Sequence, residues 1–389
     1  MKSGSWISAA LLTGVFACSS GGSGGFSGTN TNLASGGQSS SGSSSGSSSG
    51  TSGGDGVTGT ASGASSSGSG STSGANDAGA GKTTLFGDAD VPDAQLDTPI
   101  TLTMTSFSVP ANSEVYKCQQ FGNPFGHDVD LTKMVGTMSA GSHHFFLFNM
   151  SAGTGRNTAS PLGDCPGAGL EFHPFPFLSQ TPGAYTVEYG AGMGYPLVGT
   201  NGLMMNVHYL NTSGSPVTPE VSITIYPAKP GTVTTHVGTL FLNNIGISVP
   251  AMTPMSSPIN ITTSNTPIVD EDYTVFTNWS HMHQYAIDFT ASTAAGQFYE
   301  EKDWSEPPVI SAGSGAAGTN TSPMLPMKLK AGTSISWTCK YYNPTSSAMT
   351  FGDSALTQNM CIYLGQYYPA QGTPTSNPDY PDIIHAVNF

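Results

Sequence analysis

Arginine and positive charge are scarce in this chain of 389 residues, and that scarcity excludes several kinds of partner. Arg156 is the only arginine, and 24 acidic residues against 10 basic ones give a formal net charge of −14. Nucleic acids and anionic membrane surfaces attract clustered basic side chains, so neither is expected to bind here. A forked guanidinium clamp for a carboxylate or a phosphate is also nearly unavailable, which leaves few anionic substrates.

Helical periodicity and long apolar runs are missing as well. After residue 92, short segments rich in Val, Ile, Thr, Phe and Tyr recur instead, separated by clusters of Gly, Pro and Asn. This pattern is typical of an all-β sandwich or jelly roll. The clearest segments are Ile100–Thr105, Phe145–Phe148, Val221–Tyr226 and Tyr273–Thr277. We therefore expect two tandem jelly-roll-like β-sandwich domains.

Composition divides the chain into four parts. Residues 1–18 have the character of a signal peptide, and residues 19–91 form a Gly/Ser-rich linker. The linker has too little apolar surface to offset its ordering entropy, so we expect a disordered tether. Two prolines and a glycine interrupt strand-like sequence at Pro227–Gly231. We therefore expect an N-terminal domain over residues 92–227 and a C-terminal domain over residues 228–389.

The first residues predict export. Lys2 precedes the apolar stretch Ile7–Ala17, which is too short to span a bilayer as a mature helix. Cys18 follows, and the arrangement is similar to a bacterial lipoprotein signal, in which this cysteine becomes the lipidated N-terminus. Phe16 is atypical for that signal, so ordinary secretory cleavage stays an alternative, and an uncleaved apolar start is a third. We expect an outer-membrane or cell-surface lipoprotein, attached only through its lipid anchor, or otherwise a periplasmic or secreted protein.

The other four cysteines predict two disulfides, because an even number in an exported protein is typical of paired thiols. They are Cys118, Cys165, Cys339 and Cys361, and none has the C-x-x-C spacing of a zinc or redox motif. Pairing the first with the second and the third with the fourth would put one bridge in each domain. Four cysteines nevertheless permit three pairings.

His281 and His283 form a His-x-His pair in strand-like sequence. Residues two apart on a strand point to the same face, so both imidazoles can bind one ion. Met360, much later in the chain, offers a thioether, a soft ligand that copper(I) in particular accepts. Together these residues would make a redox copper site rather than a structural zinc site. Taken alone, however, Met360 is more simply interpreted as core filler.

His143 and His144 open a second strand-like segment, and His208 lies in a third. Neighbours on a regular strand face opposite ways, so the adjacent pair can bind one ion together only at a strand end or a bulge. Taken singly, each of the three fits an edge-strand histidine bonded to the backbone. The remaining histidines have no partner at ligand spacing and are interpreted as ordinary surface or core residues: His127, His173, His236 and His385.

The order of these residues is similar to that of a known family. A His-His pair, a His-Tyr dipeptide, a His-x-His triplet and a Met-Cys dipeptide follow one another across residues 100–370. They are His143-His144, His208-Tyr209, His281-Met282-His283 and Met360-Cys361, with Cys118 before the first pair and Cys165 after it. The chain thus resembles the copper type II, ascorbate-dependent monooxygenases, the family of peptidylglycine alpha-hydroxylating monooxygenase and dopamine beta-hydroxylase. In that family the corresponding cysteines pair as suggested above.

The resemblance implies an enzyme with two copper ions per chain, one in each domain, that uses ascorbate or another one-electron reductant. The family reaction inserts one atom of dioxygen into an aliphatic C–H bond and reduces the other atom to water. One copper stores and delivers an electron, and the other binds dioxygen and substrate. By the resemblance, the ligands are His143, His144 and His208 for the first copper, and His281, His283 and Met360 for the second.

The substrate anchor of the peptidylglycine enzymes is missing from this chain. There, an arginine stands two residues before the His-x-His pair, and an asparagine and a tyrosine follow the methionine by two and four residues. Trp279, Ile362 and Leu364 occupy those positions here. They indicate a more apolar substrate pocket, so we expect a small neutral or cationic organic substrate and no activity on peptides that end in glycine.

Two other classes of protein stay open. A non-catalytic, extracytoplasmic copper-binding surface protein would keep the ligands without turnover. A β-sandwich adhesion or carbohydrate-binding module would carry the histidines incidentally. Copper content separates the last class from the other two, and ascorbate-driven oxygen consumption with product formation separates an enzyme from a copper holder.

Overall fold

The computed structural model describes residues 81–84, 92–151, 159–165, 173–180, 182–267, 269–305, 307, 310–311, 325–372 and 384–388. Within them, regular structure is all strand apart from the short 3-10 helix η1 (Asp93–Gln95), and the predicted all-β fold is confirmed. No helix in these ranges has the length and apolar character needed to cross a membrane. The predicted signal peptide, its Cys18, and Arg156 lie outside the described residues.

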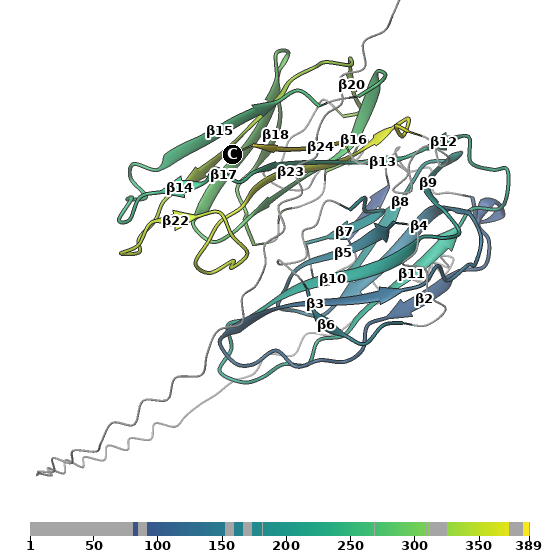
Figure 1. Ribbon diagram of the computed structural model, residues 1–389, viewed down its shortest axis with the longest axis horizontal. Coiled ribbons are helices and arrows are strands. Elements are labelled where there is room, and N and C mark those ends of the chain that lie inside the picture. Colours follow the sequence, from purple (N-terminus) through teal and green to yellow (C-terminus); the bar gives the residue numbers. More distant parts are fainter. Residues whose placement is uncertain are drawn as a thin grey trace, which may run out of the picture. The chain divides into compact units, whose positions relative to one another are not determined.

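The first sandwich packs two sheets face to face (Figure 1). One sheet contains, in order, β1 (Gly81–Thr84), β8 (Gly183–Glu188), β4 (Val129–Met138), β11 (Val221–Pro227) and β2 (Ile100–Thr103), with β9 (Met193–Leu197) on β4 and β12 (Thr235–His236) on β9. The other contains β6 (Gly163–Asp164), β3 (Ser113–Phe121), β10 (Gly202–Asn211), β5 (Ser142–Met150) and β7 (Phe177–Ser179). β12 still pairs with β9 of the first sandwich. The chain therefore passes from the first sandwich to the second after β12, beyond the predicted boundary segment Pro227–Gly231.

The second sandwich is built in the same way from later strands (Figure 1). One sheet contains β19 (Ile310–Ser311), β16 (Tyr273–Met282), β23 (Cys361–Tyr368), β13 (Gly238–Asn244) and β24 (Ile384–Asn388), with β20 (Met327–Leu329) on β16. The facing sheet contains β15 (Ile259–Asn265), β21 (Ile335–Tyr341), β17 (Ala286–Thr293) and β18 (Gly296–Glu301). A small pair joins β14 (Ser248–Val249) to β22 (Met349–Thr350).

Each sandwich carries one disulfide, and the predicted pairing is confirmed. Cys118 of β3 bonds to Cys165 in the first sandwich. Cys339 of β21 bonds to Cys361 of β23 in the second, and this bridge ties the two facing sheets together.

Two kinds of strand burial reveal where the sandwiches meet. In β11 and β21, buried residues alternate with half-buried ones, as expected when one face enters a core. In β5, β16 and nearly all of β10 and β23, both faces are buried, which requires a second packing layer.

Phe145 and Leu147 of β5 enter the first core, whereas Phe146 and Phe148 face the other way. The latter pair packs with side chains of the second sandwich in an apolar cluster that we call the interface layer. Its buried members are Cys118, Phe146, Phe148, Met150, Phe175, Leu178, Met204, Phe241, Trp279, Met360, Ile362 and Leu364.

Candidate metal centre

Five buried histidines from the two sandwiches lie in one cluster. His143, His144 and His208 form one group of metal-ligating side chains, and His143, His281 and His283 form another. Within each group the ligand atoms lie within 4.8 Å of one another. The ring centroid of His281 is 5.0 Å from that of His143 and 5.2 Å from that of His144. The histidines predicted to serve two separate domains are therefore brought together.

A β-bulge lets two adjacent histidines face the cluster. In the pairing of β10 with β5, His208 lies opposite His144, but the next residue, Tyr209, lies opposite Ser142. His143 is therefore the extra residue at the register shift. A bulge of this kind re-aims a side chain that would otherwise point to the far side of the sheet. The structure contains the irregularity that joint binding by this pair requires.

The pairing of β16 with β23 sets the second group. His281 lies opposite Ile362, and Met282 lies opposite Cys361. Continuing this antiparallel register by one pair brings His283 opposite Met360. Side chains alternate along a strand, so the two histidines and the methionine belong to the same face.

Asn359 fixes both residues just beyond the end of this pairing. Its side-chain oxygen accepts the backbone N–H of His283 at 3.1 Å and that of Met360 at 2.9 Å. Its amide nitrogen donates to the carbonyl of Gln284 at 2.6 Å. The side chain thus holds the methionine beside the histidine pair where the regular ladder has ended.

Three of the five rings are oriented by a side-chain oxygen on one nitrogen. An oxygen of this kind accepts, so the ring nitrogen that faces it carries the hydrogen and the other nitrogen keeps a free lone pair. The contacts are His144 Nε2 to Asn206 Oδ1 at 3.1 Å, His208 Nε2 to Glu114 Oε2 at 3.1 Å, and His281 Nδ1 to Gln180 Oε1 at 3.0 Å. The remaining nitrogens, His144 Nδ1, His208 Nδ1 and His281 Nε2, are buried without a hydrogen bond. Metal-ligating histidines in proteins are held in this manner.

His143 and His283 add further unpaired nitrogens. Nε2 of His143 is buried and has no hydrogen bond, and the buried ring of His283 lies beside backbone groups of Gln358 and Ser354 without a hydrogen bond of good geometry. Leaving one buried polar atom unpaired costs about 1–3 kcal/mol. Free nitrogen lone pairs of this kind are the atoms through which histidines could hold a metal ion.

Burial keeps these rings uncharged. It lowers the pKa of His143 to about 4 and the pKa of His144 to about 3. It also holds the pKa of His208, His281 and His283 well below the ordinary value, and nearby histidines, His143 first among them, add to the effect. The five rings are therefore neutral at neutral pH, which is the form that binds a metal.

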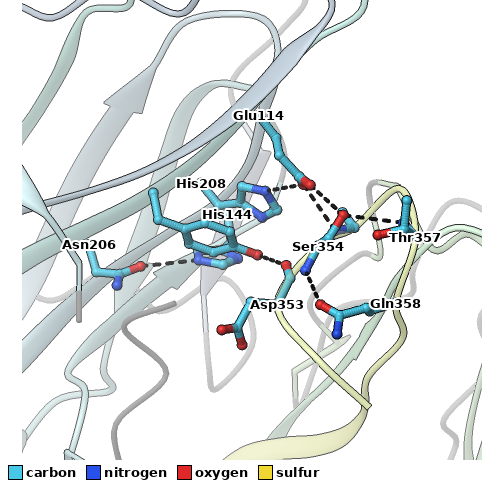
Figure 2. A network of polar contacts seen from close by, with 10 residues as sticks. Glu114, His144, Asn206, His208, Asp353, Ser354, Thr357 and Gln358 are labelled. Atoms are coloured by element: carbon cyan, nitrogen blue, oxygen red, sulfur yellow. Dashed lines mark hydrogen bonds and ion pairs between the residues drawn. The ribbon is translucent and has the colours of Figure 1, made fainter. Parts of the chain in front are cut away.

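Glu114 of β3 connects the first group to the second sandwich (Figure 2). Its carboxylate accepts the Nε2–H of His208 at 3.1 Å, the backbone N–H of Ala355 at 3.0 Å, and the hydroxyl of Ser354. Ser354 and Ala355 precede β23 in the chain. One acidic side chain thus orients a candidate ligand and anchors a loop of the opposite sandwich.

Two more contacts join the sandwiches beside the cluster. The ring of Tyr116 stacks on His208 with centroids 3.7 Å apart, and its hydroxyl donates to the carbonyl of Asp353. Gln180, which follows β7, orients His281 and also donates to the carbonyl of Ser280 at 2.9 Å. Ligands of both groups are therefore held partly by the other sandwich.

The residues predicted to form the substrate pocket lie in the interface layer. Trp279, Ile362 and Leu364 are at most 1% exposed and pack among apolar side chains of both sandwiches. A cavity of about 120 Å³ instead reaches the cluster at His143. Its other lining residues are Gly141, Ser142, Pro182, Leu210, Trp304 and Ser305. A substrate role for the three interface residues stays a prediction.

Sequence reasoning missed the residues that orient the ligands. Asn206 stands two positions before His208, so a strand places both on one face, and this spacing was a usable signal. Its amide nitrogen also donates to the sulfurs of Cys118 and Cys165 at 3.3 Å, which links the disulfide to the ring of His144. The contacts of Glu114, Gln180 and Asn359 depend on tertiary packing.

The histidines interpreted as ordinary lie outside both ligand groups wherever the structure describes their side chains. His127 Nδ1 lies 2.8 Å from the carbonyl of Phe125, and His236 Nε2 lies 3.0 Å from Asp130. The ring of His173 lies against Phe148 with centroids 6.2 Å apart. The side chain of His385 is outside the described part.

No family model and no curated protein matches this chain. Similar solved structures include the cryo-EM structure of Broad Bean Stain Virus, at 11% identity and a TM-score of 0.29, covering 74% of this chain and 92% of that chain. They also include the crystal structure of the major capsid protein P2 from bacteriophage PM2, at 9% identity and a TM-score of 0.28, covering 72% and 100%. Likeness at these TM-scores carries no argument about function.

Proposed function

We propose that this protein is a copper-dependent monooxygenase that hydroxylates an aliphatic C–H bond of a small, non-anionic organic molecule. Dioxygen is the co-substrate, and an external reductant such as ascorbate supplies two electrons. In the balanced reaction, R–H, O2, two electrons and two protons give R–OH and water. The observation that carries the proposal is the convergence of five buried, neutral histidines, each with an unpaired ring nitrogen.

The donor set favours copper over other metals. Imidazole suits both copper oxidation states, and a thioether on the same face as His281 and His283 favours copper(I). The four described cysteines are paired in disulfides, so none of them is available as a thiolate ligand. Among the described residues, neither ligand group contains a carboxylate. A structural zinc site would normally close with four ligands that include cysteine.

The residues of the chain have distinct tasks in this proposal. Copper, when bound, supplies the one-electron steps and the activation of dioxygen. Asn206, Glu114 and Gln180 fix three rings so that the lone pairs point into the cluster. The interface layer keeps water away from the methionine side of the cluster. The neutral rings need not lose protons before they bind the metal.

A second candidate is a non-catalytic copper-binding surface protein. The observation that favours it is the tight enclosure of the cluster, since the five histidines are at most 3% exposed and the adjoining cavity holds only about 120 Å³. Binding of an organic substrate then requires the enclosure to open.

Turnover separates the two candidates. The mature chain, loaded with copper, is incubated with ascorbate and a panel of aromatic amines, phenethyl compounds and neutral lipids. The proposal expects a product heavier by one oxygen and oxygen consumption above that of copper and ascorbate alone. A His281→Ala variant serves as the control without the oxygen-side ligand. Tight copper binding with no product across the panel would favour the surface protein.

A further inference from the structure

We propose that Met252 and Met255 form a surface site for copper(I), separate from the buried histidine cluster. The preference for a soft monovalent cation rests on the two thioethers. The choice of copper(I) as the natural ion rests on the proposed function.

Exposure sets these two methionines apart from the rest of the described chain. Met252 is 68% exposed and Met255 is 63% exposed, and no other large apolar side chain among the described residues is exposed. The other described methionines are all buried: Met104, Met134, Met138, Met150, Met193, Met204, Met205, Met282, Met327, Met349 and Met360. Packing inside the protein is therefore a role open to every described methionine except this pair.

Two consecutive turns present the pair to solvent. The hydroxyl of Thr253 donates to the carbonyl of Pro250 at 2.8 Å, and the backbone N–H of Ser257 donates to the carbonyl of Pro254 at 3.0 Å. Met252 belongs to the first of these turns, and Met255 belongs to the second. Both thioethers are therefore carried by one short loop between β14 and β15.

The second sandwich holds this loop in place. The backbone N–H of Met252 donates to the carbonyl of Thr345 at 3.0 Å, and Thr253 forms a β-bridge with Asn343. The side-chain amide of Asn343 also donates to the carbonyl of Pro250 at 3.1 Å. These contacts fix the backbone between the two methionines, so less conformational entropy is lost when both sulfurs bind one ion.

The backbone of Met252 is strained. Its φ is 58°, in the left-handed region that favours glycine. A strained backbone persists where surrounding contacts fix it, and such positions cluster at functional sites. The strain at Met252 holds an apolar side chain in solvent, where burial does not offset it. Contact with an ion gives this exposed thioether a role that packing does not.

The chemistry of the loop favours a soft ion. Residues 250–258 contain no acid, histidine or cysteine, so the thioethers are their only metal-ligating side chains. Calcium and magnesium require oxygen ligands, and zinc takes histidine, cysteine or carboxylate. Thioethers are among the soft ligands that select copper(I), and the net charge of −14 attracts cations to the protein.

The test uses silver(I), a redox-inert substitute for copper(I), and protein labelled with carbon-13 at the methionine methyl groups. The methyl signals of Met252 and Met255 are expected to shift together and to saturate with one ion bound between them. Copper(I), added without oxygen, is expected to shift the same two signals. Signals that move independently, fail to saturate or stay in place would overturn the proposal, because they would mean adventitious contact or no site.

A sulfur-free variant of the same apolar character is the matched comparison. Met252→Leu combined with Met255→Leu is expected to bind one silver ion fewer than the unmodified protein in equilibrium dialysis. Met138→Leu, which changes a buried methionine of the first core, should bind as many ions as the unmodified protein. Equal silver content in the double variant and the unmodified protein would contradict the site and favour an apolar contact with another protein, which leucine preserves.

This result is separable from the outcome for the proposed function. His281→Ala removes a candidate ligand of the buried cluster and should leave the two methyl shifts unchanged. Copper(II) prefers harder ligands than thioethers, so loading with copper(II) counts the cluster alone. Loss of the methyl shifts in His281→Ala would contradict a separate site, whereas failure of the cluster to bind copper would leave the methionine site standing.

Discussion

The two ligand groups differ in how firmly their rings are held. In the first sandwich, His144 and His208 are each fixed by a side-chain oxygen of the same sheet. In the second sandwich, His281 takes its acceptor from the other half, and His283 lies beside backbone groups of Gln358 and Ser354 with no side-chain oxygen on its ring. The first group is therefore preorganised within its own sheet, whereas the orientation of His281 in the second depends on a side chain of the other sandwich.

The chemical surroundings of the two ligand groups also differ. The carboxylate of Glu114 adjoins His208 and offsets positive charge there, which favours copper(II). Met360 offers a soft thioether in an apolar layer, which favours copper(I). Under the proposed function, the first group would pass on electrons and the second would bind dioxygen.

The largest expected effect comes from removing the thioether. Met360→Ile should abolish oxygenation, because the dioxygen-binding copper loses the ligand that favours its reduced state. Copper held by the first group should remain reducible by ascorbate. Product formation and stopped-flow reduction of copper measure the two properties separately. Met138→Ile changes an equally buried methionine of the first core and should keep its activity. Retained turnover in Met360→Ile would refute the assignment.

Acid should destabilise the metal-free protein. The folded-state pKa values of His143 and His144, about 4 and about 3, lie below the unfolded value of about 6.5, so the unfolded chain takes up protons first. Stability is full above about pH 6.5 and falls toward about pH 4, by about 1.4 kcal/mol per pH unit for each ring.

Urea unfolding at about pH 7.5 and about pH 5 measures this loss of stability. Carboxylates also titrate in acid, so the comparison is made with a variant that carries His143→Leu and His144→Leu. The difference in pH dependence between the two proteins isolates the rings. Identical dependence would contradict neutral burial of this pair.

Loss of the second disulfide is expected to disturb the oxygen-side ligand. Replacing Cys339 and Cys361 by Ala should lower the free energy of unfolding by about 2–5 kcal/mol. Cys361 adjoins Met360, so copper binding at the second group should weaken as well. Denaturant unfolding and copper titration measure the two effects. Unchanged copper affinity in the folded double variant would show that the bridge does not support the ligand.

The smallest expected effect tests the preorganised group. Glu114→Gln keeps the shape of the side chain but removes its charge, and changes of this kind typically cost about 10–100-fold in metal affinity. The loss should be larger for copper(II) than for copper(I). Glu220→Gln, at an exposed position, is the control. Equal affinity of Glu114→Gln and the unmodified protein for both oxidation states would remove the contrast between the groups.

The fold was predictable because its signals are local. Alternating residues in Val221–Tyr226 and the continuous apolar run at Phe145–Phe148 match the burial of β11 and β5. The disulfide pairing followed from parity and position. The bulge at His143 was not predictable, because it exists only in the pairing of β5 with β10.

The candidate site was predictable only in its ligand types. Spacing indicated that His281 and His283 share a face, and the register agrees. Nothing local indicated that the two histidine groups meet, because their closeness depends on how two sandwiches pack. The hydrogen bond of Gln180 to His281 could not be predicted from the sequence for the same reason, because the two residues belong to different sandwiches.

The central claim is that the clustered histidines hold copper. Its most direct test is the copper content of the purified protein after loading and gel filtration. We predict two copper ions per chain in the unmodified protein and the loss of at least one in His281→Ala. Fewer than two ions in the unmodified protein, or the same content in both proteins, would contradict it.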